Sequence, residues 1–182
     1  MAPTAKQRKL IQELDRTCYK LGLDYWNSES RIEWSSTELE WMLRWIARGQ
    51  VVYEYTVVDE VLSCRICWFL FGKRPFPKLW RTKKFRLFNY HVIEQLSLMP
   101  KLKFVKSLSG LPKAIYADIE RLNDLRNALA HSLWPENLKR YRPMATWKGK
   151  SIFTADGLVA FDDDMAKIHE HFKDVFLTAS NS

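Results

Sequence analysis

The feature that most constrains this chain is an uninterrupted stretch, Lys113 to Trp134, that contains neither Gly nor Pro. Pro112 precedes it, where proline suits the first turn of a helix, and Pro135 follows it, where proline ends one. Apolar residues recur through the stretch at steps of three and four, at Ile115, Ile119, Leu122, Leu125 and Leu129. This spacing predicts one amphipathic helix of about five turns, and the rest of the chain also favours an all-α fold.

Polar side chains gather toward the end of this helix. Glu120, Asp124, Asn127 and His131 cluster opposite the apolar stripe, whereas Arg126 projects into it, where a guanidinium is costly unless it meets an anion or carbonyl groups. A cation, an amide and an imidazole near one helix end favour a phosphodiester site, because Arg binds phosphate oxygens and His transfers protons near neutral pH. The alternative is that Arg126 and His131 only pair with nearby acidic residues.

The segment R-N-A-L-A-H, residues 126–131, resembles the Arg-Asn-x-x-x-His signature of the HEPN superfamily. These are all-helical domains that include metal-independent RNases of toxin, abortive-infection and CRISPR systems. The N-D-L before the motif and the Ser after it are similar to small bacterial members, and the resemblance covers roughly residues 35–178. It implies Arg126, Asn127 and His131 as catalytic residues, with Glu120 and Asp124 as candidates for orienting them and with neither a cofactor nor a metal.

The resemblance also implies an endoribonuclease in which two signature helices of a homodimer face each other. His131 would act as general base or acid, Arg126 would stabilise the transition state, and Asn127 would hold substrate or imidazole. A second possibility is a non-catalytic HEPN module that binds RNA or a nucleotide, or that scaffolds a defence complex. A third is a toxin whose antitoxin modifies a Tyr two residues after the motif histidine, but that position is Leu133. Either way, a neutralising or activating partner is expected.

Charge and composition suggest an RNA partner and a cytoplasmic location. The 182 residues are enough for one domain, 1–182, and Lys plus Arg at 29 against Asp plus Glu at 21 gives a net charge of +8. Such an excess favours a polyanionic partner. The cysteines Cys18, Cys64 and Cys67 cannot all pair, and Met1 is not followed by a secretory signal, so a reducing compartment is expected.

A second candidate site is a basic segment, 72–88, predicted to be a loop. Its cations alternate with aromatic residues, a mixture that single-stranded RNA binding uses for phosphates and bases. The predicted RNA-binding residues are Trp80, Arg81, Lys83, Lys84 and Arg86. The alternative is a solvated loop whose aromatic residues anchor it in the core.

The first seventy residues predict three helices. Residues 1–34 would form an N-terminal helix, which Gly22 ends, and a polar connection. Ser35 and Glu38 resemble a capping box for a second helix, which Gly49 would stop. Val51 to Phe71 then predicts a long central helix, and its four charged residues argue against a membrane span.

The C-terminal part predicts a hairpin and a helix. Residues 142–154 alternate around Lys148-Gly149, which favours a short β-hairpin. Residues 155–178 predict a final helix with an apolar stripe, at Leu158, Phe161, Met165, Ile168, Phe172 and Val175. The run Asp162 to Asp164 predicts a solvated face and not a metal site, and the C-R-I-C at Cys64 and Cys67 predicts buried helical cysteines.

Overall fold

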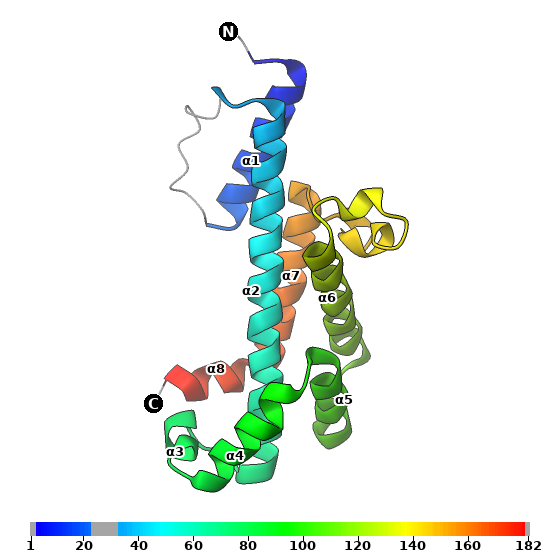
Figure 1. The fold of residues 1–182 in the computed structure, drawn as a ribbon. Helices are drawn as coiled ribbons and strands as arrows, with labels where there is room; N and C mark the ends of the chain where they lie inside the picture. Colours follow the sequence, from blue (N-terminus) through cyan, green and yellow to red (C-terminus); the bar gives the residue numbers. More distant parts are fainter. Residues whose placement is uncertain (1–2, 23–32, 181–182) are drawn as a thin grey trace. The chain divides into compact units, whose positions relative to one another are not determined.

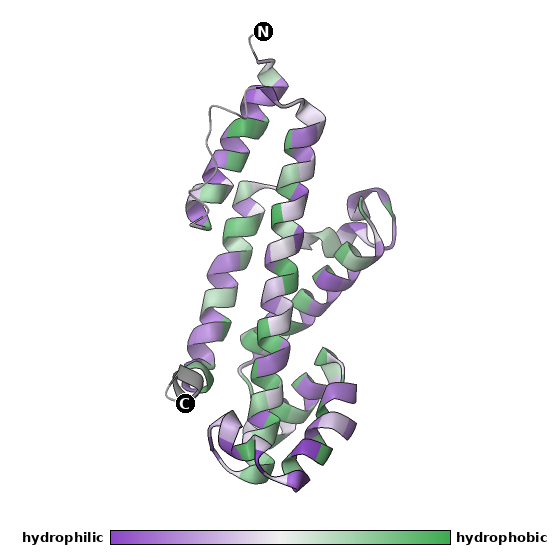
Figure 2. Ribbon diagram, turned by 60° about the vertical axis from the view of Figure 1, so that its left-hand side comes forward, coloured by the Kyte–Doolittle hydropathy of each residue, from purple (hydrophilic) through white to green (hydrophobic). Residues whose placement is uncertain are grey.

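The computed structural model of the chain describes residues 3–22 and 33–180. Within these residues the chain forms eight α-helices and one two-stranded antiparallel sheet, which confirms the all-α prediction (Figure 1). Along the long helices hydrophobic residues alternate with hydrophilic ones, as amphipathic helices require (Figure 2). Most of the predicted connection at 24–34 lies outside the described residues.

The elements follow one another along the chain in this order: α1 (Ala5–Lys20), α2 (Ser36–Phe71), α3 (Phe76–Trp80), α4 (Lys83–His91), the 3-10 turn η2 (Ile93–Gln95), α5 (Leu98–Ser109), α6 (Lys113–His131), η3 (Pro135–Asn137), η4 (Arg142–Ala145), β1 (Thr146–Trp147), β2 (Lys150–Ser151), α7 (Ala155–His171) and α8 (Lys173–Ser180). They fall into two compact units. The first comprises Met1–Val52 and Asp124–Asp164, and the second comprises Tyr53–Asn123 and Met165–Ser182. The boundaries lie inside α2, α6 and α7, so each of these helices contributes to both units.

In the first unit, α1 packs against the beginning of α2 through Leu14, Cys18, Leu39 and Leu43, all of them buried. Both helices begin with a capping box. The predicted one at α2 is confirmed, because the backbone N–H of Ser35 donates to Oε2 of Glu38 over 2.7 Å, while the N–H of Glu38 donates to Oγ of Ser35 over 3.3 Å.

A single helix, α2, covers the residues for which the sequence predicted two helices. The prediction that Gly49 stops a helix was wrong, because α2 runs without a break from Ser36 to Phe71. A glycine inside a helix costs only about 1 kcal/mol relative to alanine. Residues buried on both sides of it, including Leu43, Ala47 and Val51, stabilise the helix through this point. The long central helix is therefore confirmed and is longer than predicted.

The predicted hairpin is confirmed in the first unit. Thr146 pairs with Ser151 and Trp147 with Lys150, and the turn residues Lys148 and Gly149 have φ of 47° and 83°, as a two-residue hairpin turn requires. The first turn of α7 approaches this hairpin closely, because a Cβ on Gly157 would lie 1.9 Å from the carbonyl oxygen of Ser151. Only glycine fits this contact.

The aspartates of α7 do not form one solvated face. Asp164 is buried, and its Oδ2 accepts hydrogen bonds from Nε1 of Trp147 over 2.9 Å and from Nζ of Lys148 over 2.5 Å. Only Asp163 of the three is fully exposed. The prediction was wrong for Asp164 because the hairpin places an indole donor and an ammonium against it, which offsets the cost of burying the carboxylate.

In the second unit, the predicted loop 72–88 is largely helical. The chain turns at Gly72, whose φ is 80°, and then forms α3 and α4. Thr82 caps α4, since its Oγ1 accepts from the backbone N–H of Phe85 over 3.4 Å. The buried ring of Phe85 packs edge to face on Phe71, with ring centroids 5.5 Å apart. The N-cap and the buried side chains of Leu79 and Phe85 favour helices over a loop in this segment.

The final helix is interrupted in the second unit, so the prediction of one helix over 155–178 was wrong. α7 ends at His171, and α8 starts again at Lys173. Asp174, in the first turn of α8, accepts from Nη2 of Arg65 over 2.7 Å and from Nζ of Lys73 over 3.2 Å. These bonds hold the start of α8 at the end of α2, while the predicted stripe, including Phe172 and Val175, stays buried.

None of the helices in the described part of the chain has the length and apolar character needed to span a membrane.

Candidate functional site

The R-N-A-L-A-H motif forms the last turns of α6, which ends at His131. Arg126 is half-buried between the buried residues Leu122 and Leu129 of the same helix, and its Nη1 donates to Oδ1 of Asn127 over 3.3 Å. The head of Arg126 thus reaches a side chain of the polar face, although the residue itself lies in register with the apolar stripe. The first two motif residues are in direct contact.

The motif histidine is exposed and lies against an aromatic ring. The imidazole of His131 stacks on Tyr141, with ring centroids 6.1 Å apart and an angle of 16° between the planes. The guanidinium of Arg140 lies 5.4 Å from the centroid of the same tyrosine ring. The segment after the motif thus brings an aromatic ring and a cation beside His131, and Lys139 and Arg142, their neighbours in the sequence, are also exposed.

An arginine of α2 caps the end of the motif helix. The guanidinium of Arg48 donates to the carbonyl oxygens of Leu129, Ser132 and Leu133, the last two over 2.7 and 2.8 Å. These carbonyls lie where a helix runs out of its own donors. Burial and the nearby charge of Arg44 lower the pKa of Arg48, while Glu136 opposes them. Arg48 therefore fixes the backbone on both sides of His131.

One turn earlier on α2, Arg44 holds the segment that follows. It pairs with Glu136, and its guanidinium carbon lies 3.9 Å from the ring centroid of Trp134 and 4.3 Å from that of Phe153. Burial acts to raise the pKa of Glu136, but the hydrogen bond from Arg44, a backbone hydrogen bond and the charges of Arg44 and Arg48 together outweigh it, so the pKa lies below its ordinary value. Arg142 continues the network by donating to the carbonyl of Glu136 over 2.7 Å.

The candidates for orienting the motif lie elsewhere on α6. Glu120 is half-buried beside Tyr116, and the pKa of that tyrosine is raised by desolvation of the phenol and, to a smaller extent, by the charge and hydrogen bond of Glu120. Asp124 is exposed. The described contacts of these two carboxylates do not include the motif residues.

The predicted RNA-binding residues separate into two groups in the second unit. Trp80, Lys83 and Arg86 line one pocket of about 430 Å³, while Arg81 and Lys84 are exposed and are not among the residues that line it. Nη1 of Arg86 donates to the carbonyl of Trp80 over 3.0 Å, which ties α4 to α3. Trp80 packs edge to face on Phe85, with centroids 5.5 Å apart.

Sequence reasoning missed Arg44, Arg48 and Tyr141. The signal for the arginines was present, because two guanidinium groups four residues apart in an otherwise apolar segment need acceptors. For Tyr141 the signal was the cation-rich K-R-Y-R at 139–142. Its proximity to His131 depends on the turn at η3, which the sequence did not predict.

The cysteines of α2 carry thiols of low reactivity. Burial raises the pKa of Cys64 to about 12 and that of Cys67 to about 11, and both are free. Such thiols hold little of the thiolate that reacts or binds metal at neutral pH. Within the residues that the structure describes, His, Cys, Asp and Glu side chains form no group of three or more that could hold a metal ion.

Comparison of the chain with protein-family models, with curated protein sequences and with solved structures gives no match.

Proposed function

We propose that this protein is a metal-independent endoribonuclease of the HEPN type, with Arg126, Asn127 and His131 as its catalytic residues. The observation that carries the proposal is the arrangement at the end of α6. A half-buried guanidinium contacts an amide, and one turn later an exposed imidazole lies in a cation-rich surrounding. These are the groups that phosphodiester cleavage requires: an anion clamp and a proton carrier.

In the proposed reaction the ribose 2′-oxygen attacks the adjacent phosphorus, and the bond from phosphorus to the 5′-oxygen breaks. His131 accepts the proton of the 2′-hydroxyl as general base or, when protonated, donates one to the leaving 5′-oxygen. Arg126 stabilises the charge that builds up on the phosphate oxygens, and Asn127 holds the substrate or the imidazole. The products are a 2′,3′-cyclic phosphate and a 5′-hydroxyl.

The surroundings of the motif support this assignment. Arg48 fixes the carbonyls on both sides of His131, so the imidazole is held on an ordered backbone. Tyr141, stacked on that imidazole, offers a ring beside which a base of the substrate can lie. Lys139, Arg140 and Arg142 are exposed and provide positive charge for the phosphate backbone.

The test is cleavage of labelled RNA in the presence of EDTA. Arg126→Ala and His131→Ala should each lower the cleavage rate at least about a hundredfold, the lower end for losing an acid–base group or a charge clamp. The double variant should be little slower than either single one, because residues that act as a unit are not additive. A strand with a 2′-deoxy sugar at the cleaved position should stay intact.

The matched control is His171→Ala, which removes another exposed histidine from a helix end. It should cleave RNA at the wild-type rate. Thermal melting must accompany each assay, because Arg126 is half-buried and its loss could disturb packing. Full cleavage by a folded His131→Ala protein would remove the general base and defeat the proposal.

The second candidate function is a non-catalytic HEPN module that binds RNA or a nucleotide, or that scaffolds a defence complex. It is favoured by the large apolar side chains that α2 exposes, notably Trp45, Tyr53 and Phe69, since such residues often mark protein contacts. The same assay separates the two functions. A wild-type protein that binds RNA without cleaving it would support the module.

We also propose that the enzyme works in the cytoplasm under the control of an antitoxin or another regulator of a toxin or anti-phage system. None of the three cysteines, all of which the structure describes, forms a disulfide, as in a reducing compartment. An unregulated RNase would damage its own host, which calls for such a partner. Leu133 is exposed at the position where the modified tyrosine of one toxin type would lie, and leucine has no hydroxyl to modify.

A further inference from the structure

The outer face of α4 carries a pocket whose lining residues are all exposed, although the ring of Trp80 also packs on the buried Phe85. Its volume is about 430 Å³, and its walls include Trp80, Lys83, Arg86, Leu87, Tyr90 and Glu94. This volume falls in the range of small-molecule sites, about 300–1,000 Å³. Of these residues, sequence analysis had singled out only Trp80, Lys83 and Arg86.

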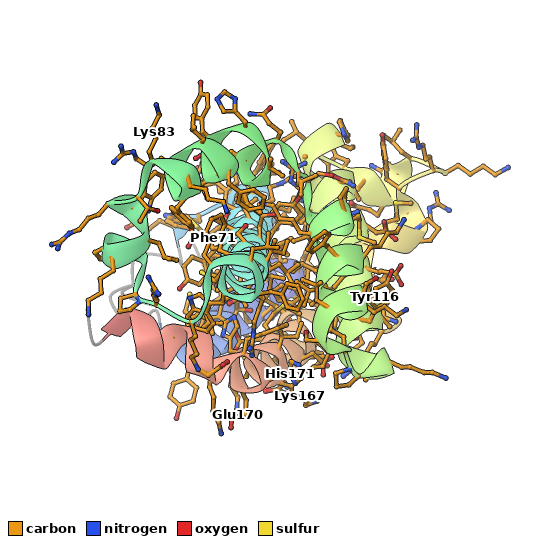
Figure 3. The ribbon with its side chains drawn as sticks, turned by 90° about the horizontal axis from the view of Figure 1, so that it is seen from below. Phe71, Lys83, Tyr116, Lys167, Glu170 and His171 are labelled. Carbon is orange, nitrogen blue, oxygen red and sulfur yellow. The ribbon has the colours of Figure 1, made fainter. Side chains whose placement is uncertain are left out.

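The two faces of α4 differ sharply. The inner face buries Phe85 and Asn89 and packs on Phe71, whereas Lys83 points away from the protein (Figure 3). On the outer face Leu87 is 49% exposed and Tyr90 is 61% exposed. The core therefore does not account for these two side chains, which form an apolar floor in contact with water.

The electrostatics around this floor favour an anion. Lys83 and Arg86 line the pocket, and the exposed Arg81 and Lys84 lie next to them in the sequence, whereas Glu94 is the acidic residue of the lining. A second copy of the chain is a poor occupant for this face, because two such basic surfaces repel each other. A ligand that combines negative charge with a flat apolar group satisfies both the cations and the exposed rings.

The two ends of the pocket carry opposite charges. Lys83 and Arg86 lie near the start of α4, and the bond from Arg86 to the carbonyl of Trp80 holds that guanidinium in place. At the other end Glu94, which accepts from Nδ2 of Asn89 over 2.7 Å, also lines a neighbouring pocket with Asp59. Carboxylates repel phosphate, so a phosphate group belongs at the lysine and arginine end.

We propose that this pocket binds one unpaired nucleotide of a single-stranded nucleic acid. The base lies against Trp80 and Tyr90, and its phosphate is held by Lys83 and Arg86. Bases inside a duplex are stacked on their neighbours and cannot reach such a floor. The site goes beyond the proposed cleavage reaction, because it lies in the second unit and can bind a strand whether or not the motif is catalytic.

The test is binding of a short fluorescein-labelled oligo(A) RNA, followed by fluorescence anisotropy. The protein carries His131→Ala, so that the probe stays intact if the proposed function is right. Tyr90→Ala should raise the Kd about fivefold or more, the lower end for losing one base-stacking ring. The matched control is Phe104→Ala, because Phe104 is another exposed ring of the same unit outside the pocket and should leave the Kd unchanged.

The phosphate contact is tested by salt dependence. Lys83→Ala should weaken binding and lower the slope of log K against log salt by about 0.7, the value for one phosphate contact on a single strand. Lys103→Ala removes another exposed lysine, from α5, and should leave both quantities unchanged. Thermal melting shows whether each variant is folded.

Three outcomes would overturn the proposal. The first is a Kd that Tyr90→Ala leaves unchanged in a folded protein. The second is equal affinity for oligo(A) and for a duplex of the same length. The third is Tyr90-dependent binding to phosphatidylserine vesicles without binding to oligo(A), which would make this face a membrane surface.

Weaker binding of oligo(dA) than of oligo(A) would support RNA as the strand, and equal binding would support a single strand of either kind. None of these results depends on cleavage, so the site and the proposed function can fail separately.

Discussion

At the scale of single residues, the surroundings of His131 depend on charged side chains that satisfy one another. Arg44 meets a carboxylate and two aromatic rings, and Arg48 meets three backbone carbonyls. The flat face of the half-buried Arg44 lies on rings and one of its donors meets Glu136, while its Nη1 has no hydrogen-bond partner among the residues that the structure describes. The donors of the half-buried Arg48 meet carbonyl oxygens. Both arginines therefore act as positioning residues for the motif, without touching its side chains.

Glu136 gives this network a pH dependence. Its pKa lies below the ordinary value of 4.5, because its hydrogen bonds and the charges of Arg44 and Arg48 together outweigh the effect of burial. The unfolded state then binds more protons than the folded state as the pH falls through this range. The contribution of Glu136 to stability is thus present above about pH 4.5 and is lost as the pH falls through the folded pKa.

We predict that Glu136→Gln lowers the melting temperature at pH 7 and that the gap to wild type closes below the folded pKa of Glu136. Thermal melts between pH 7 and pH 3 measure it. Glu170→Gln is the control, because Glu170 forms an exposed pair with Lys173, and exposed pairs contribute little. If the difference in melting temperature between Glu136→Gln and wild type were the same at all pH values, the charge of Glu136 would not be the cause of that difference.

At the scale of elements, the end of α6 needs donors from outside the helix. The last carbonyls of any helix lack intrahelical partners, and here α2 supplies the missing donors through Arg48. Since His131 is the last residue of α6, the same cap orders the backbone that carries the imidazole.

We predict that Arg48→Met destabilises the protein by about 1–3 kcal/mol, the cost of leaving partly buried polar groups without a partner. Urea unfolding measures the loss. Hydrogen exchange should show faster opening of the last turn of α6, a readout that a general loss of packing would not confine to that turn. Arg8→Met, an exposed arginine on α1, should leave both measurements unchanged. Equal protection of α6 in Arg48→Met would contradict the capping role.

The continuity of α2 through Gly49 leads to another prediction at this scale. Gly49 is exposed and helical, and a Cβ built on it meets no atom within 4 Å. Gly49→Ala should therefore stabilise the protein by about 0.5–1 kcal/mol, because alanine loses less backbone entropy than glycine. Urea unfolding measures the change.

Gly149→Ala is the matched comparison. Gly149 has a φ of 83° in the hairpin turn, a conformation that strains any residue with a Cβ. This substitution should destabilise the protein. Stabilisation by both changes, or by neither, would mean that backbone conformation does not decide the effect.

At the scale of the whole molecule, the proposed reaction needs more groups than one motif carries. Each chain supplies one motif arginine and one motif histidine, whereas 2′-hydroxyl attack benefits from both a base and an acid. Two copies related by a two-fold axis would bring two complete motifs to one cleft.

We therefore predict a homodimer. Light scattering at micromolar concentration should give twice the chain mass of 21.6 kDa. The active-site variants His131→Ala and Arg126→Ala should keep this mass if they act on chemistry and not on assembly. A monomeric protein that still cleaves RNA would refute the shared cleft.

The sequence by itself determined the features that depend on neighbours along the chain. Apolar spacing predicted α1, α6 and the helical nature of 51–71, and the turn pair Lys148-Gly149 predicted the hairpin. The motif was also visible as a local pattern. Periodicity, caps and turns involve residues a few positions apart, so one sequence window contains all the information that they need.

Only the tertiary structure decided which groups meet from distant positions. Arg48 reaches the end of α6, Tyr141 lies against His131, and Asp164 is buried under Trp147. Two helix boundaries also differ from those that the sequence predicted. Packing stabilises α2 across Gly49, and ion pairs with Asp174 hold α8 after the break at Phe172. A long-range contact can outweigh a local preference of about 1 kcal/mol, and no window of the sequence contains both of its partners.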